Sequence, residues 1–211
     1  MVKVKICGIT NLDDAREAVK AGADAVGFVF HRPSPRYVAP SRARQIIRSL
    51  PVGVKKIGVF VNAKPARIKL IAARCSLDMV QLHGTESARA CGRCWPLKVI
   101  KAFRLRRQED LARVAGYRTF GYLFDAYVPG RPGGTGTTLP RGLRCAIRRV
   151  RLHGEVFLSG GLNARNVRAA IRSARPQWVD VSSSVESSPG KKDSRKMAAF
   201  VRVAKRMPLE S

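Results

Sequence analysis

Short apolar runs alternate with stretches of helical periodicity along the whole chain. The runs are four to six residues long and rich in Val, Ile and Phe, which is typical of buried strands. Because parallel neighbours cannot be joined by tight hairpins, the helical stretches between the runs predict crossover helices. The expected strands cover residues 2–7, 25–30, 56–61, 79–82, 97–102, 121–125, 155–159 and 178–182.

Several of the helical stretches begin at good start signals, such as Thr10-Asn11 before the first and Asn163 before the seventh. Eight strand and helix units favour a closed (β/α)8 TIM barrel, an α/β fold, over an open doubly wound sheet. The 211 residues are enough for one such domain, residues 1–211. The expected helices cover residues 12–21, 41–50, 65–74, 87–93, 107–115, 141–152, 164–174 and 194–206.

A thiol and a carboxylate stand at the ends of two of the expected strands. Cys7 ends the first run and Asp125 ends the sixth. In a barrel of parallel strands all carboxyl ends meet at one rim, where active sites of this fold are built. The two side chains are therefore candidates for a general base and a general acid.

The loops after the last two strands have the composition of a phosphate site. Residues 159–163 read SGGLN and lead into a helix, and residues 180–184 read DVSSS. Glycine lets backbone N–H groups approach an anion, and helix N-termini favour negative charge, so the loops predict bound phosphate. Ordinary strand-to-helix turns that need glycine for the backbone are the alternative. The candidate residues are Gly160, Gly161, Asp180, Ser182 and Ser183.

Three further features of the expected rim are candidates. Arg36, after the second strand, can meet a carboxylate bidentately, with a solvated surface arginine as the alternative. His83 ends the fourth strand, where it either binds substrate or makes a structural hydrogen bond to a loop. The long glycine- and proline-rich loop at 129–136 predicts a cover over the substrate or a disordered insertion.

Composition adds limits on setting and chemistry. No apolar stretch approaches the roughly 20 residues of a bilayer span, and the N-terminus enters a strand pattern directly, so we expect a soluble, cytoplasmic protein with no membrane partner. Five cysteines, an odd number, predict free thiols, including the Cys91-x-x-Cys94 pair, which lacks a second Cys or His pair. The sequence implies no metal, because no His, Cys or Asp set has metal spacing. It implies no nucleotide cofactor, because it lacks the glycine motifs that bind nucleotides.

The chain is unusually basic, with 41 Lys and Arg against 14 Asp and Glu and a formal net charge of +27. Such a charge attracts anions and binds nucleic acid non-specifically at low salt. The basic residues are spread through helical stretches such as 141–151 and 165–175, not gathered in one tail with aromatic residues. This distribution favours a solvated basic surface over a dedicated nucleic-acid groove.

Eight short motifs follow one another along the chain. They are Lys5-Ile6-Cys7-Gly8-Ile9-Thr10, Gly27-Phe28-Val29-Phe30, Ser34-Pro35-Arg36, Gly58-Val59-Phe60-Val61-Asn62, Gln81-Leu82-His83-Gly84, Pro132-Gly133-Gly134-Thr135-Gly136, Ser159-Gly160-Gly161-Leu162 and Asp180-Val181-Ser182-Ser183. Taken in order, these motifs resemble those of the phosphoribosylanthranilate isomerase family over essentially the full chain. The opening KICGIT and the later QLHG are the most specific to it among phosphate-binding barrels. The chain departs from the family pattern at Ser184, where the family usually has Gly.

The resemblance implies an Amadori rearrangement in tryptophan biosynthesis, with a small phosphosugar as substrate. Asp125 would be the general acid that opens the ribose ring, and Cys7 the general base that removes the proton from C2′. No cofactor or metal is implied, because the protonated imine is itself the electron sink. The implied substrate-binding residues are Arg36 for the anthranilate carboxylate, backbone N–H groups around Gly160, Gly161, Ser182 and Ser183 for the phosphate, and also His83 and Asp180.

Two other functions stay open from the residues alone. The related histidine-pathway isomerase shares the architecture but uses carboxylates at both key strand ends, and Cys7 speaks against it. A barrel without catalytic activity, or one that uses its charge on nucleic acid, is the second alternative. The assembly is expected to be a monomer or a homodimer.

Overall fold

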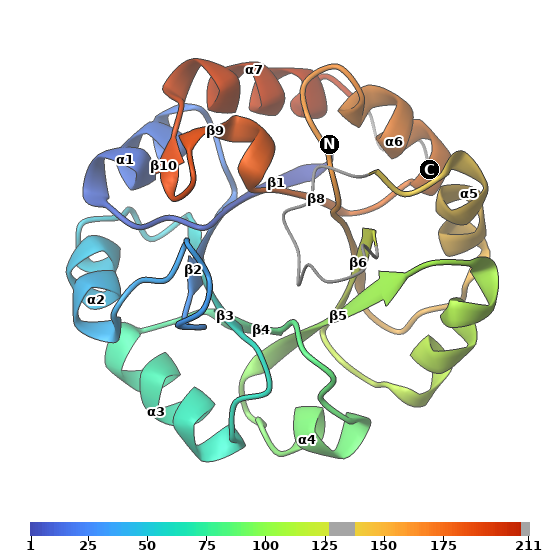
Figure 1. Ribbon diagram of the computed structural model, residues 1–211, viewed down its shortest axis with the longest axis horizontal. Helices are drawn as coiled ribbons and strands as arrows, with labels where there is room; N and C mark the ends of the chain where they lie inside the picture. Colours follow the sequence, from blue (N-terminus) through green and yellow to red (C-terminus); the bar gives the residue numbers. More distant parts are fainter. Residues whose placement is uncertain (127–137, 208–211) are drawn as a thin grey trace.

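The eight expected strands form a closed parallel barrel in the computed structural model, which describes residues 1–126 and 138–207 (Figure 1). Each strand pairs with the next in sequence, and the last pairs with the first, so the prediction of a TIM barrel is confirmed. The strands are β1 (Lys3–Cys7), β2 (Ala25–Val29), β3 (Lys55–Phe60), β4 (Met79–Leu82), β5 (Lys98–Leu105), β6 (Gly121–Ala126), β7 (Glu155–Leu158) and β8 (Trp178–Val181).

Helices surround the barrel, as Figure 1 shows, and most are shorter than their sequence pattern. The stretch expected as an α-helix at 107–115 is instead a 3-10 helix, η1 (Gln108–Gly116). Its only buried side chains, Leu111 and Val114, are three residues apart, which suits three residues per turn. The others are α1 (Leu12–Lys20), α2 (Pro40–Arg48), α3 (Pro65–Cys75), α4 (Ala88–Gly92), α5 (Arg141–Arg149), α6 (Val167–Ala174) and α7 (Ser194–Lys205).

A small hairpin between β8 and α7 has no counterpart in the sequence prediction. After the short 3-10 helix η2 (Ser183–Val185), strands β9 (Glu186–Ser188) and β10 (Lys191–Lys192) pair antiparallel. The hairpin lies beside α1 (Figure 1), and the Thr10 hydroxyl donates to the Gly190 carbonyl at 2.6 Å. The hairpin thereby brings the side chains of β9 and β10 over the end of β1.

The barrel interior is apolar in its middle and becomes polar toward the carboxyl ends of the strands. Side chains alternate along a strand, so a residue two positions beyond an interior one is also interior. Asp125 follows the interior Leu123 in this way, and Gln81 follows Met79. The middle of the interior is filled by Ala25, Ile57, Met79, Ile100, Ala102, Leu123, Phe157 and Trp178.

No helix among the described residues is long and apolar enough to cross a membrane.

Candidate active site

Cys7 lies at the end of β1 with only 7% of its surface exposed. Ser182 from the end of β8 donates its hydroxyl hydrogen to the Cys7 carbonyl at 3.1 Å. A side chain on Gly27 would come within 2.8 Å of the Cys7 sulfur, so the neighbouring strand needs glycine there. Burial raises the pKa of the Cys7 thiol, while the positive charge of Lys5 opposes that rise.

Lys5, two residues before Cys7 on the same face of β1, is completely buried. Its Nζ donates to Asp180 Oδ1 on β8 at 2.7 Å. Burial works to lower the Lys5 pKa, but the negative charges of Asp180 and of Cys7 outweigh burial and raise it. Lys5 is therefore an ammonium ion beside the thiol at neutral pH.

Arg36, in the loop after β2, lies near Cys7, and its guanidinium already pairs with a protein carboxylate. Its Nε and Nη2 each donate to Glu186 on β9 at 2.8 Å. Lys192 on β10 donates to the same carboxylate at 2.8 Å and to the Ser182 carbonyl at 3.2 Å. Only Nη1 of Arg36 lies outside the pair with Glu186.

The pKa values of these groups follow from their contacts. Burial works to raise the pKa of Glu186, yet the bonds from Arg36 and Lys192 hold it below its usual range. The bond to Glu186 raises the pKa of Arg36. Burial lowers the pKa of Lys192, and Glu186 offsets only part of that effect.

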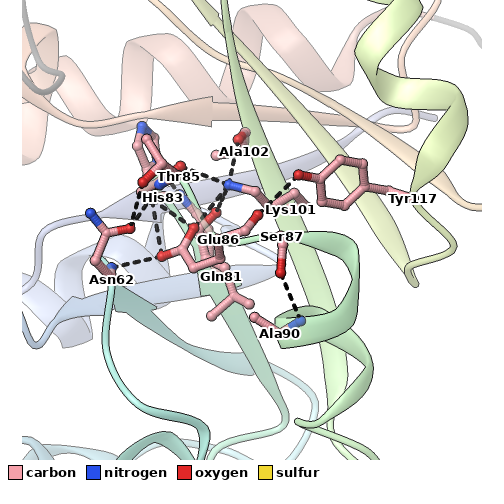
Figure 2. A network of polar contacts seen from close by, with 12 residues as sticks. Asn62, Gln81, His83, Thr85, Glu86, Ser87, Ala90, Lys101, Ala102 and Tyr117 are labelled. Carbon is pink, nitrogen blue, oxygen red and sulfur yellow. Dashed lines mark hydrogen bonds and ion pairs between the residues drawn. The ribbon is translucent and has the colours of Figure 1, made fainter.

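Asp125, on β6, is 5% exposed and faces His83. Asp125 Oδ2 lies 3.4 Å from His83 Nε2, a close contact that does not meet the geometry of a hydrogen bond. The other ring nitrogen, Nδ1, is 2.7 Å from the amide nitrogen of Gln81. Figure 2 labels both residues in their polar network. The imidazole is thus oriented by Gln81 toward the acid, and not by the loop backbone.

The loop after β7 lies directly against Asp125. Gly160 has a positive φ of 86°, and a side chain there would come within 2.8 Å of Asp125 Oδ1 and of the Ala126 amide. Only glycine satisfies both requirements. In the part of the chain that the structure describes, the amides of Gly160 and Gly161 donate to no protein acceptor. They are free to bind an anion.

The loops after β7 and β8 are joined to each other. The Ser184 hydroxyl, at the position where the family usually has Gly, donates to the Leu162 carbonyl. Asn166 donates to the Gly161 carbonyl at 2.9 Å and holds the first loop from the other side. The two predicted phosphate loops therefore lie side by side.

The barrel brings the predicted residues to one mouth. Strands β6, β7, β8 and β1 are consecutive neighbours, so only two strands separate Asp125 from Cys7. A chain of contacts crosses those strands, because Asp180 also lies 3.4 Å from the Ser159 hydroxyl, next to Gly160. The loop at 129–136, predicted as a cover, lies outside the described residues.

Other candidate chemistry is sparse. Among residues 1–126 and 138–207, no group of three His, Cys, Asp or Glu side chains could hold a metal ion. Cys91 and Cys94 are both buried, unpaired thiols. Sequence reasoning missed Lys5, Gln81, Glu186 and Lys192. For Lys5 a signal was present, because a lysine two residues before Cys7 shares its interior face.

Comparison with known proteins decides among the possible functions of this mouth. The family model described as N-(5'phosphoribosyl)anthranilate (PRA) isomerase matches residues 4–203. The chain belongs to this family. The PRA isomerase of Pelobacter propionicus is 48% identical over 211 residues, which are 100% of this chain and 99% of the relative.

Solved structures of the PRA isomerase family agree. The crystal structure of the Thermotoga maritima enzyme has a TM-score of 0.91 and 45% identity, covering 98% of this chain and 100% of that one. A PRA isomerase structure in complex with reduced 1-(o-carboxyphenylamino)-1-deoxyribulose 5-phosphate has a TM-score of 0.87, 44% identity and the same coverage. The Thermotoga maritima PRA isomerase is also described as dimeric.

Membership in the PRA isomerase family confirms the main sequence predictions. The chain is an intramolecular aldose–ketose isomerase of tryptophan biosynthesis with a TIM-barrel fold. The family match decides against the histidine-pathway isomerase and against a barrel that only binds nucleic acid. The roles of individual residues stay predictions.

Proposed function

We propose that this chain converts N-(5′-phosphoribosyl)anthranilate to 1-(2-carboxyphenylamino)-1-deoxyribulose 5-phosphate, with Cys7 as general base and Asp125 as general acid. The observation that carries the proposal is the family match over residues 4–203. It is supported by the position of both side chains at the same mouth, each nearly buried.

The reaction begins at the ribose ring oxygen. Asp125 gives its proton to that oxygen, and the ring opens to a protonated imine. The Cys7 thiolate then removes the proton from C2′, and the electron pair of that C–H bond moves toward the imine nitrogen to give an enolamine. The enolamine gains a proton at C1′ while its C2′ hydroxyl loses one, and it becomes the aminoketone. No redox partner is needed, since atoms and electrons balance within the substrate.

Substrate binding uses the loops around these two groups. The free amides of Gly160 and Gly161, with Ser182 and Ser183 beside them, bind the phosphate. Arg36 contributes to binding the anthranilate carboxylate through Nη1, because Glu186 occupies its other two nitrogens.

Two further predicted substrate-binding residues lie next to the catalytic pair, one in direct contact and one through a lysine. His83 lies against Asp125, and Asp180 holds Lys5 beside Cys7. Both side chains border the mouth where the ribose is proposed to bind.

The direct test is to follow the loss of phosphoribosylanthranilate fluorescence with the purified protein. Cys7→Ala and Asp125→Asn are each expected to lower kcat by about 10²–10⁴, the usual contribution of a general acid or base. Cys75→Ala is the matched control, because Cys75 is an equally buried thiol on the outer layer, at the end of α3. Wild-type turnover that survives both active-site substitutions, or no turnover at all, would contradict the proposal.

The setting follows from the same proposal. We infer a cytoplasmic enzyme of one domain, residues 1–211, supported by its free cysteines and by its biosynthetic family. It acts as a monomer or a homodimer, and sedimentation equilibrium on the purified chain decides between them. Its net charge of +27 leads to salt-sensitive, non-specific contact with nucleic acid.

A further inference from the structure

Cys7 is surrounded by a cluster of buried charges drawn from four parts of the chain. None of the charged side chains is more than 15% exposed, and two lysines are completely buried. The Cys7 cluster consists of Lys5 on β1, Arg36 in the loop after β2, Asp180 on β8, and Glu186 and Lys192 on the hairpin β9–β10.

The charges of the Cys7 cluster do not balance without the thiol. Three cations, Lys5, Arg36 and Lys192, face two carboxylates, Asp180 and Glu186. An uncompensated charge away from water is costly. The cluster is neutral when Cys7 is a thiolate, so its excess positive charge works against the burial that raises the Cys7 pKa.

Lys5 is the cation of the cluster best placed to supply that charge. Lys192 is tied to Glu186 and to the Ser182 carbonyl, and Arg36 is tied to Glu186 through two nitrogens. Lys5 has one protein carboxylate, Asp180. Its side chain lies beside the Cys7 thiol, because a Cβ on Gly27 would come within 3.2 Å of Lys5 Cε and within 2.8 Å of the Cys7 sulfur.

We propose that Lys5 is a positioning residue of the isomerase: its ammonium group, held by Asp180, stays beside the Cys7 sulfur and stabilises the thiolate that removes the C2′ proton. The inference rests on the proposed function for the identity of that proton. Asp180 accepts from Lys5 and fixes where its ammonium group lies, while its own negative charge opposes formation of the thiolate.

The test measures the ionisation of Cys7 directly. Alkylation of the folded protein by iodoacetamide, read at the Cys7 peptide by mass spectrometry across pH, gives the midpoint for thiolate formation. Lys5→Met is expected to raise that midpoint by about 1–3 pH units, the range that one neighbouring charge produces. The acid limb of kcat/KM against pH is expected to move the same way.

A second variant changes the charge in the opposite sense and disturbs the fold less. Asp180→Asn keeps the shape and a hydrogen-bond acceptor for Lys5 but removes a negative charge that raises the Cys7 pKa. It is expected to lower the midpoint. An unchanged midpoint in both variants, or a shift of the same sign in both, would overturn the proposal.

Lys101→Met is the matched control. Lys101 is equally buried and pairs with Glu86, on the side of the barrel formed by β4 and β5. It shares the folding cost of Lys5→Met but is expected to leave the Cys7 midpoint unchanged. Because alkylation needs no substrate, opposite shifts in a protein without isomerase turnover would support the Lys5 inference while refuting the proposed function.

Discussion

Two buried lysines, on opposite sides of the barrel, have the same kind of ionic partner and different surroundings. Lys5 meets Asp180 at 2.7 Å, and Lys101 meets Glu86 at 2.9 Å. Lys101 also donates to the carbonyls of Leu82 at 3.3 Å, Gly84 at 2.8 Å and Ala102 at 3.0 Å. Lys5 has no such carbonyl partners in the described structure and faces a thiol instead.

The partner carboxylates differ in the same way. Glu86 accepts from the amides of Asn62 at 2.8 Å and of Gly84 at 3.0 Å, and its own carbonyl accepts from the Tyr117 hydroxyl (Figure 2). The Lys101–Glu86 pair has no net charge, and it holds the loop after β4 through its hydrogen bonds to Gly84. A buried lysine that donates to backbone carbonyls as well as to its carboxylate holds a loop in place, whereas one with a reactive neighbour tunes chemistry.

The largest expected effect is a loss of stability, which Lys101→Met shares with Lys5→Met, and the pH profile of kcat/KM is what separates the two lysines. Lys101→Met leaves Glu86 buried without its cation and is expected to lower the free energy of unfolding by about 3–5 kcal/mol. Urea denaturation measures this loss. The pH profile of kcat/KM is expected to stay as in the wild type. A profile that moved as far as in Lys5→Met would erase the distinction between the two sites.

Cys91 shows how the pKa of a thiol responds to the neutral Lys101–Glu86 pair. Burial raises its pKa to about 11, although Lys101 is near, because Glu86 cancels that charge. Because the Cys91 pKa is higher in the folded protein than in the unfolded chain, burial of the neutral thiol stabilises the fold fully below the unfolded pKa of 9.0. This stability is lost as the pH rises toward the folded pKa of about 11. The expected loss over this window is roughly 2–3 kcal/mol.

Thermal denaturation at a series of pH values measures this loss. Cys91→Ala is expected to flatten the alkaline decline, whereas Cys145→Ala, which removes a partly exposed thiol, should retain it. An identical decline in the wild type and in Cys91→Ala would show that another group is responsible.

Glu186 tests the charge balance of the Cys7 cluster, on the side of the barrel away from Lys101. Glu186→Gln removes the bonds of a carboxylate to Arg36 and Lys192 and is expected to cost about 1.5–3 kcal/mol at neutral pH. Because its pKa is lowered in the folded state, this stability is present above the ordinary glutamate range and lost as pH falls through the folded value. The gap between wild type and variant in acid titrations of stability should therefore close at low pH.

The smallest expected effect is at Ser184, which ties the two phosphate loops together. Ser184→Ala removes its bond to the Leu162 carbonyl and is expected to lower stability by about 1 kcal/mol. Ser184→Gly, which restores the residue usual in the family, should cost slightly more because it also frees the backbone. Calorimetry distinguishes the two, and a more stable glycine variant would contradict the role of the hydroxyl.

Much of the fold could be predicted from local pattern. The eight runs and their order were sufficient for the barrel, and the position of Cys7 and Asp125 at strand ends placed both at one rim. The 3-10 form of η1 was not predictable, since it depends on Leu111 and Val114 packing against the barrel. The hairpin β9–β10 was missed because its strands are three and two residues long and carry no apolar run.

The sequence by itself determined that a thiol, Cys7, and a carboxylate, Asp125, stand at strand ends on the catalytic rim. It could do so because the end of a strand is set by residues only a few positions away. Only the tertiary structure decided the partners of the charged groups. Lys5 and Asp180 are 175 residues apart and meet because β8 closes the barrel against β1, and Arg36 and Glu186, 150 residues apart, meet because the hairpin folds over that mouth. Apart from Lys5, whose spacing from Cys7 puts it on the same face of β1, nothing local marks which of the 41 cations will be buried beside the thiol. Barrel closure determines that.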